Sequence, residues 1–146
     1  MMRLGSMITA IALGVGLAPA PLVAEQDAPR KLVAPVRGEA TVELTPPNTQ
    51  VKGDNVVTIF LIKNTSKGPI AGFKVQENWF NKSNEALSGD EYRHPRPFQV
   101  DEVIQVTLTV PRARVVGARN QYQFSHANGA IKTTVNKTLT LTKKPS

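Results

Sequence analysis

A two-residue alternation of apolar and polar side chains is the strongest pattern in the sequence. It is clearest over residues 104–110 (IQVTLTV), where four aliphatic residues share one face and Gln or Thr occupies the other. Residues 40–44 (ATVEL) alternate in the same way. Residues 55–63 (NVVTIFLIK) are almost continuously apolar and rich in β-branched side chains, which is typical of a central strand covered on both sides or at its ends. All three segments are therefore predicted to be β-strands.

Two further strands are predicted between these segments. Residues 73–79 (FKVQENW) place three apolar side chains on one face, although Glu77 interrupts that face. Residues 86–92 form a weaker strand. Residues 94–97 (HPRP) lie outside any sheet, because two prolines remove two backbone donors. The intervening turns are expected at residues 64–69 and 81–84.

The last part of the chain predicts a β-hairpin. Asn128-Gly129 is the preferred dipeptide of a two-residue type I′ turn, and in that register Ala127 pairs with Ala130. Directly opposite side chains share a face, so the hairpin would carry one apolar patch with His126 at its rim. The expected patch consists of Tyr122, Phe124, Ile131 and Val135.

About seven short strands separated by turns favour an all-β fold. We predict an immunoglobulin-like antiparallel β-sandwich, with a small barrel as the alternative. No helical period of useful length appears after the first 24 residues. The expected order along the chain is a signal peptide (1–24), a flexible linker (25–38), the sandwich (39–142) and a basic tail (143–146).

The signal peptide is predicted from three features of the N-terminal segment. Arg3 precedes an apolar centre over residues 7–17, and a small-residue exit ends at Ala24. Two prolines limit any helix to about a dozen apolar residues, fewer than the roughly 20 that span a bilayer. We therefore expect cleavage after Ala24, no integral membrane span afterwards and a secreted or periplasmic location. An uncleaved membrane anchor is the alternative.

Composition narrows the class of protein further. A length of 146 residues allows one domain, and the absence of cysteine rules out disulfides, a thiolate nucleophile and a Cys-ligated zinc site. An exported domain without disulfides suits a bacterial envelope. The formal charge is +7, and it becomes +6 when Arg3 leaves with the signal peptide. A basic balance of this kind suits contacts with acidic partners.

Several segments of the chain resemble the FxLYD-like family of small immunoglobulin-like domains that bacteria export. The matching segments are residues 64–66 (NTS), 69–75 (PIAGFKV), 79–81 (WFN) and 98–111, and the resemblance covers residues 38–141. At the position of the family's name-giving motif this chain has ENWFN. Residues 120–129 (NQYQFSHANG) also resemble short uncharacterised exported bacterial proteins. The resemblance implies an immunoglobulin-like fold and cell-envelope interactions, and it supplies no catalytic residue.

The sequence contains no recognisable catalytic set. Ser125 and His126 are adjacent, but neighbours on a strand point to opposite faces, and the same holds for the acidic pair Asp90-Glu91. No nucleophile elbow, phosphate loop or metalloprotease motif is present. The two histidines have no evident third metal ligand. We therefore expect no enzyme activity, no cofactor and no metal.

A candidate binding site follows from the expected topology. Alternate loops of a sandwich lie at the same end, so the loops at residues 64–69 and 93–97 and the turn at 127–129 should meet there. Loops on a rigid scaffold are the usual place for binding residues. The simpler interpretation is a solvated basic surface with His126 capping the core. The candidate residues are Lys67, Arg93, His94, Arg96, His126 and Asn128.

The functional hypothesis is a non-catalytic module that binds an envelope protein or an anionic polymer. We expect no nucleic-acid partner, because no basic run is interleaved with exposed aromatic residues. The alternative hypothesis is a structural subunit of a cell-envelope assembly that uses edge-strand pairing.

Overall fold

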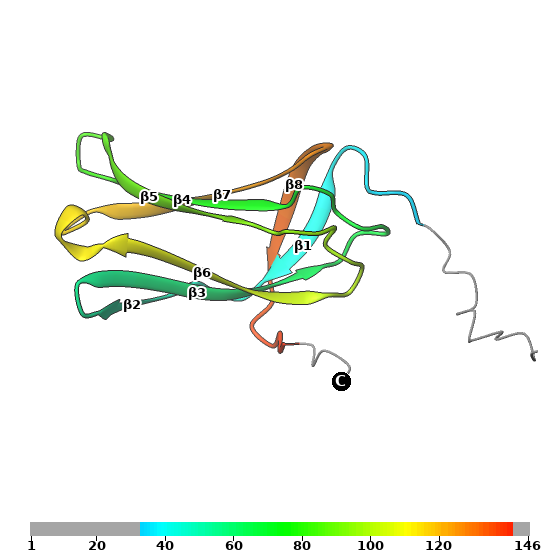
Figure 1. Ribbon diagram of the computed structural model, residues 1–146, viewed down its shortest axis with the longest axis horizontal. Coiled ribbons are helices and arrows are strands. Elements are labelled where there is room, and N and C mark those ends of the chain that lie inside the picture. The colour runs from blue at the N-terminus through cyan, green and yellow to red at the C-terminus, as the bar shows by residue number, and fades with distance from the viewer. Residues whose placement is uncertain (1–32, 142–146) are drawn as a thin grey trace, which may run out of the picture. The chain divides into compact units, whose positions relative to one another are not determined.

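The computed structural model describes residues 33–141 (Figure 1). The predicted signal peptide and basic tail lie outside these residues. The described part of the chain contains eight β-strands and one short 3-10 helix. They are β1 (Ala40–Leu44), β2 (Asn48–Lys52), β3 (Asn55–Asn64), β4 (Lys74–Phe80), β5 (Ala86–Arg93), β6 (Val103–Pro111), η1 (Arg112–Arg114), β7 (Arg119–His126) and β8 (Gly129–Val135). No helix in this part is long and apolar enough to cross a membrane.

The strands form one hydrogen-bonded sheet that curls over itself. Its order is β2-β3-β1-β8-β7-β4-β5, and β6 pairs with the other edge of β3. The curl places β5, β4 and β7 over β6, β3 and β2, while β1 and β8 connect these two layers at one end (Figure 1). The prediction of an all-β fold is confirmed.

The sheet is mixed, so the expectation of a wholly antiparallel arrangement is wrong at one pair. β1 runs parallel to β8 over Ala40–Leu44, and its other edge pairs antiparallel with the end of β3. β1 lies where the sheet folds over, and it pairs with β3 on one edge and with β8 on the other. The alternation in residues 40–44 indicates a strand, but it carries no information about which strands lie beside it.

β2 has no counterpart among the predicted strands. Its sequence, NTQVK, follows two prolines, and all five residues are exposed. A strand exposed on both faces has no apolar alternation from which to recognise it. It forms because a two-residue turn, with Gly53 at a φ of 61°, folds it back against the first half of β3.

The hairpin of β7 and β8 has a different register from the predicted one. Ser125 pairs with Ala130 and His126 with Gly129, so the turn residues are Ala127 and Asn128. Neither turn residue has a positive φ, which excludes a type I′ turn. Gly129 instead packs against the backbone of Gly38, whose carbonyl oxygen lies 2.2 Å from the position a Cβ at residue 129 would take. A contact distant in sequence therefore selects the register.

β8 then leaves β7 and joins β1, so the predicted hairpin-wide patch does not form. Tyr122 and Phe124 of β7 and Ile131 of β8 are partly buried against the core, but Val135 is 58% exposed. Phe60 of β3 meets the rings of Tyr122 and Phe124 edge-on, with centroids 5.6 and 6.3 Å apart. These aromatic contacts hold the two layers together.

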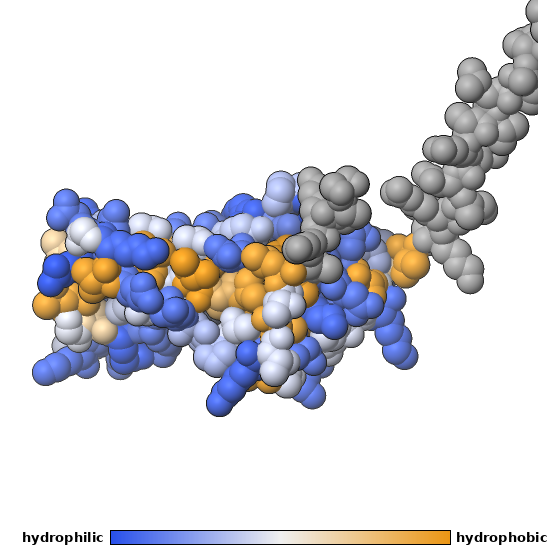
Figure 2. Space-filling model, turned by 90° about the horizontal axis from the view of Figure 1, so that it is seen from below, coloured by the Kyte–Doolittle hydropathy of each residue, from blue (hydrophilic) through white to orange (hydrophobic). Residues whose placement is uncertain are grey.

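The core lies between the layers and is built from alternating residues of the predicted strands. The inward positions of β6 are buried, and its outward positions carry exposed Gln and Thr residues. On the outward side of β3, Val57, Ile59 and Leu61 are only half-buried. The molecule seen from the side of β2 and β3 shows an apolar band between hydrophilic margins (Figure 2). The nearly continuous apolar sequence of β3 therefore corresponds to buried inward side chains and half-buried outward ones.

Candidate functional site

The three loops that carry the candidate residues meet at one end of the fold. Ala127 donates its backbone N–H to Ala71, at 2.9 Å. Ile70 and Phe98 exchange two backbone hydrogen bonds of 2.9 and 2.8 Å. The loop after β3 therefore touches both the segment before β6 and the β7–β8 turn. We call this region the loop end.

Asn64 fixes the geometry of the loop end from within. Its side chain is fully buried, and its Nδ2 donates to the carbonyl oxygens of Gly68 and Phe98, at 3.1 and 2.9 Å. Its Oδ1 accepts from the backbone N–H of Ser66 at 2.8 Å. A buried amide with these partners ties two loops to the end of β3, because each lost bond would leave a buried polar group unpaired.

Residues 36–38, within the segment expected to be a linker, also contact the loop end. Val36 donates to the carbonyl of Pro69, and Gly38 donates to the carbonyl of Asn128, each at 2.9 Å. The chain thus lies along the loops immediately before β1 begins.

The two arginines of the candidate set are paired with carboxylates. Arg96 binds both oxygens of Glu102, at 2.5 and 3.3 Å, and Arg93 lies 3.0 Å from Glu91. Glu91 also lies 3.5 Å from Lys74. Positive charge at the loop end is therefore partly balanced by acidic residues outside the candidate set, and exposed pairs of this kind are screened by solvent.

His94 is part of the interior rather than of the surface. Its side chain is only 5% exposed, and its Nδ1 is hydrogen-bonded to the Tyr92 hydroxyl at 2.8 Å. Its Nε2 has no hydrogen-bond partner and lies 3.9 Å from a Glu102 oxygen. Burial lowers the pKa of His94; Glu102 raises that pKa, and Arg96 lowers it. The ring is therefore neutral at pH 7.

His126 and Asn128 also hold the backbone. The His126 Nε2 lies 2.8 Å from the carbonyl oxygen of Gly38 and 3.1 Å from that of Ala130, so this nitrogen carries the proton and donates. The Nδ1 atom accepts from the backbone N–H of Asn128 at 3.3 Å. These contacts fit the capping role that the sequence offered as the simpler interpretation for His126.

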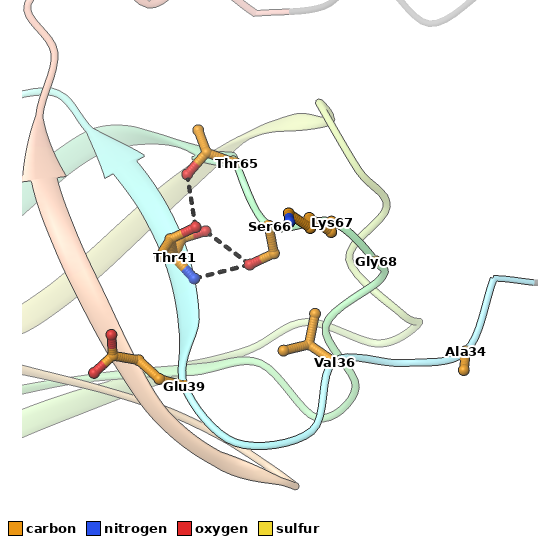
Figure 3. A pocket seen from close by; sticks show the side chains of 8 residues that line it. All are labelled: Ala34, Val36, Glu39, Thr41, Thr65, Ser66, Lys67 and Gly68. Atoms are coloured by element: carbon orange, nitrogen blue, oxygen red, sulfur yellow. Dashed lines mark hydrogen bonds between the residues drawn. The ribbon is translucent and has the colours of Figure 1, made fainter.

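Lys67 alone among the six candidates lines a hollow at the loop end. This groove has a volume of about 460 Å³ and lies between the segment before β1 and the loop after β3. Ser66 Oγ donates to the Thr41 carbonyl at 3.0 Å and accepts from the Thr41 N–H at 2.8 Å. Thr65 donates to the Thr41 hydroxyl at 3.2 Å (Figure 3). The lining residues are Ala34, Val36, Glu39, Thr41, Thr65, Ser66, Lys67 and Gly68.

A second polar cluster lies between the layers. Glu77, which interrupts the apolar face of β4, is 1% exposed and accepts from the Trp79 Nε1 at 2.9 Å. Asn120 donates to the Tyr122 hydroxyl at 2.7 Å and lies 3.4 Å from the other Glu77 oxygen. The buried carboxylate of Glu77 therefore has partners on both β4 and β7, as a buried charge requires. In the sequence, the one sign of this cluster is the glutamate that interrupts the apolar face of β4.

Tyr122 connects that cluster to the facing layer. Burial raises the pKa of Tyr122 to about 12; hydrogen bonding to Thr58 lowers it, and Glu77 adds to the rise. Thr58 is fully buried and shares a 2.9 Å hydrogen bond with Thr49. These hydrogen bonds satisfy the buried Thr58 hydroxyl and link β7 to the facing layer. Within residues 33–141 no group of three His, Asp or Glu side chains could hold a metal ion.

Three further arginines lie at the opposite end. The backbone N–H of Arg112 donates to the Asp54 carbonyl at 2.9 Å. The Arg119 guanidinium hydrogen-bonds to Asn84 and lies 5.4 Å from the Phe80 ring centroid. Arg114 ends η1. Six of the basic residues within residues 33–141 are thus divided between the two ends of the fold: Lys67, Arg93 and Arg96 at the loop end, and Arg112, Arg114 and Arg119 at the other.

Comparisons with solved structures give distant likenesses. No family model matches the sequence, and no curated protein shows a significant match to it. The structure is similar to one described as "structural characterization of IrmA from Escherichia coli", with a TM-score of 0.38 and 7% sequence identity. The match covers 73% of this chain and 99% of the other.

Proposed function

We propose that this chain is a non-catalytic, exported module that binds an anionic partner of the bacterial cell envelope through the groove at the loop end. The groove is the observation that carries the proposal, because it places the Lys67 side chain beside hydroxyl groups on a supported scaffold. Export rests on the signal-peptide pattern of residues 1–24. The resemblance to FxLYD-like domains supports an immunoglobulin-like assignment of the fold and an envelope role.

The groove lining favours an acidic polysaccharide. An ammonium group can pair with a carboxylate or phosphate, while the hydroxyls of Thr41 and Thr65 can exchange hydrogen bonds with sugar hydroxyls. Glu39 can accept from a sugar hydroxyl and would oppose a second acidic group placed next to it. Such contacts are exposed, so binding should be weak and sensitive to salt.

Retention of the purified protein on an immobilised polyuronate, measured at increasing salt, tests this function. We expect Lys67→Gln to elute at clearly lower salt than wild type, because it removes the cation in the groove. Lys82→Gln is the matched control, since it removes one exposed charge from the β4–β5 turn at the opposite end. Equal elution of the two variants would contradict the proposal. Arg96 is a poorer test, because its replacement would leave Glu102 without its guanidinium partner.

A structural subunit of an envelope assembly is the second candidate function. It is favoured by one specific observation: β8 pairs with only two residues of β7, which leaves most of one edge of β7 without a neighbouring strand among the described residues. An exposed strand edge can add a strand from another chain. Salt-insensitive co-purification with a large envelope complex would support this function over polysaccharide binding.

A further inference from the structure

The open edge of β7 has a definite length. β7 pairs with β4 over seven residues, from Arg119 to Ser125. On its other edge only Ser125 and His126 pair with β8, which then turns away to join β1 (Figure 1). Within residues 33–141 no strand pairs with that edge from residue 119 to residue 124.

The backbone groups on this edge follow from the alternation of antiparallel pairing. His94 donates its backbone N–H to Phe73, so the odd-numbered residues of β4 point their backbone groups toward β5 and the even-numbered ones toward β7. Gln76 is opposite Gln123, so odd-numbered residues of β7 face β4. Residues 120, 122 and 124 therefore direct their N–H and C=O groups to the open edge.

The open edge of β7 lacks the features that usually block strand addition. Between Asn120 and Ser125 the sequence (NQYQFS) contains no charge, proline or glycine. Natural edge strands are commonly protected by charges, prolines, bulges or covering groups. The side chains of Tyr122 and Phe124 are only partly buried on the inner side of this strand.

Two other strand edges carry charged residues. β5 carries Asp90, Glu91 and Arg93. Asp90 also reaches across to β6, where its Oδ2 accepts from the backbone N–H of Thr109 at 2.8 Å. β2 has five residues and ends in Lys52. The edge of β7 from residue 120 to residue 124 carries no such charge.

We propose that two copies of this chain associate through antiparallel pairing of their β7 strands, centred on Tyr122. In this register Asn120 lies opposite Phe124 of the second copy. All three residues whose backbone groups point to the open edge are therefore paired in each copy. Gln121 lies opposite Gln123 of the second copy. The pairing ends at residues 120 and 124, because Ala130 of β8 already lies beside Ser125 on this edge. No charge faces a like charge, although both copies are basic.

The pairing joins the two layers that contain β7 into one continuous sheet, in the order β5-β4-β7-β7-β4-β5. It gives hydrogen-bond partners to the backbone groups of residues 120, 122 and 124 on both copies. It also covers the partly buried rings of Tyr122 and Phe124. A two-fold arrangement of this kind is closed, because each open edge is used once.

This inference rests on the second candidate function only in its use of the strand edge, and not on the polysaccharide groove. A partner strand from a different protein is the competing occupant. The second copy is favoured because the uncharged β7 segment brings no like charges together when it pairs with itself, and its polar residues lie opposite polar residues at positions 121 and 123.

Sedimentation velocity of the purified protein over a range of concentrations provides the test. We expect wild type to dimerise. The double variant Gln121→Lys, Gln123→Lys places lysine opposite lysine twice and should weaken association at least about tenfold. The matched variant Gln121→Lys, Gln123→Glu places lysine opposite glutamate and should retain the dimer. Both glutamines are exposed, and far-UV circular dichroism checks that each variant is folded.

Three outcomes would overturn the inference. They are a wild type that stays monomeric at high concentration, a dimer unaffected by the two lysines, and equal loss of association in both double variants. Lys67→Gln should leave the dimer unchanged, so failure of the polysaccharide proposal is distinguishable from failure of this one. A monomer that co-purifies with a large envelope complex would retain the second function and reject the self-association.

Discussion

His94 shows how the environment of one residue changes its meaning. In the sequence it is a histidine beside two prolines and two arginines, which suggests an exposed basic loop. In the structure its ring lies 5.4 Å from that of Phe98 and is hydrogen-bonded to Tyr92. The neutral ring serves the interior, and Arg96 next to it is neutralised by Glu102. The candidate site therefore changes from a basic cluster to a groove that includes Lys67.

The buried His94 predicts loss of stability at mildly acid pH. Its pKa is lowered in the folded state, so below about pH 6.5 the unfolded chain binds a proton that the folded chain resists. The free energy of unfolding should therefore fall as the pH decreases from 7 to 5, by at most about 1.4 kcal/mol per pH unit for one proton. Urea unfolding at each pH measures this change.

His94→Phe is the control, because it keeps an aromatic ring and cannot titrate. The facing groups Glu102, Arg96 and Tyr92 remain in both proteins, so the difference between the two pH profiles isolates His94. Identical pH profiles for the two proteins would show that His94 does not resist protonation in the folded state.

At the scale of the element, the sequence predicts a strand best where adjacent residues alternate between apolar and polar side chains. β6 is found from its alternation alone, because alternate side chains of any strand point to opposite faces. β2 was missed because all of its residues are exposed. The β7–β8 register was wrong because Asn128-Gly129 favours one turn locally, while the Gly38 backbone occupies the space beside Gly129.

That contact makes Gly129 a sensitive position. Gly129→Ala would place a Cβ 2.2 Å from the Gly38 carbonyl oxygen at a φ of 155°, so we expect it to lower the free energy of unfolding by about 2–3 kcal/mol. Gly53→Ala is the matched control, since its φ is also positive but no atom lies within 4 Å of the new Cβ. It should cost about 1 kcal/mol. Urea denaturation that ranks Gly53→Ala as the more damaging change would contradict this role for Gly129.

At the scale of the whole molecule, the two layers are joined by backbone pairing and by side-chain contacts. β1 links β3 to β8, which joins β7 at the hairpin, and Tyr122 of the Glu77 cluster contacts Thr58 and Phe60 of β3 across the interior. Trp79, the only tryptophan of the chain, packs with Val56 of β3 and Val110 of β6. Its fluorescence therefore reports the contact between the layers.

We expect the layers to unfold together. Urea transitions followed by Trp79 fluorescence and by far-UV circular dichroism should have the same midpoint, because neither layer keeps a core without the other. A fluorescence change at clearly lower urea, with the circular dichroism signal retained, would show that the layers separate before the strands melt.

The sequence by itself determined the β-class of this protein, the position of most strands and the turns between them. These features depend on side-chain alternation and on prolines and turn residues, which act on their immediate neighbours. Only the tertiary structure decided that β1 runs parallel to β8, that β8 leaves the edge of β7 open, and that Glu77 is satisfied by Trp79 and Asn120. It also decided that the arginines at the loop end are paired while Lys67 lines a groove. Those outcomes depend on contacts between residues far apart in the chain, which no local pattern records.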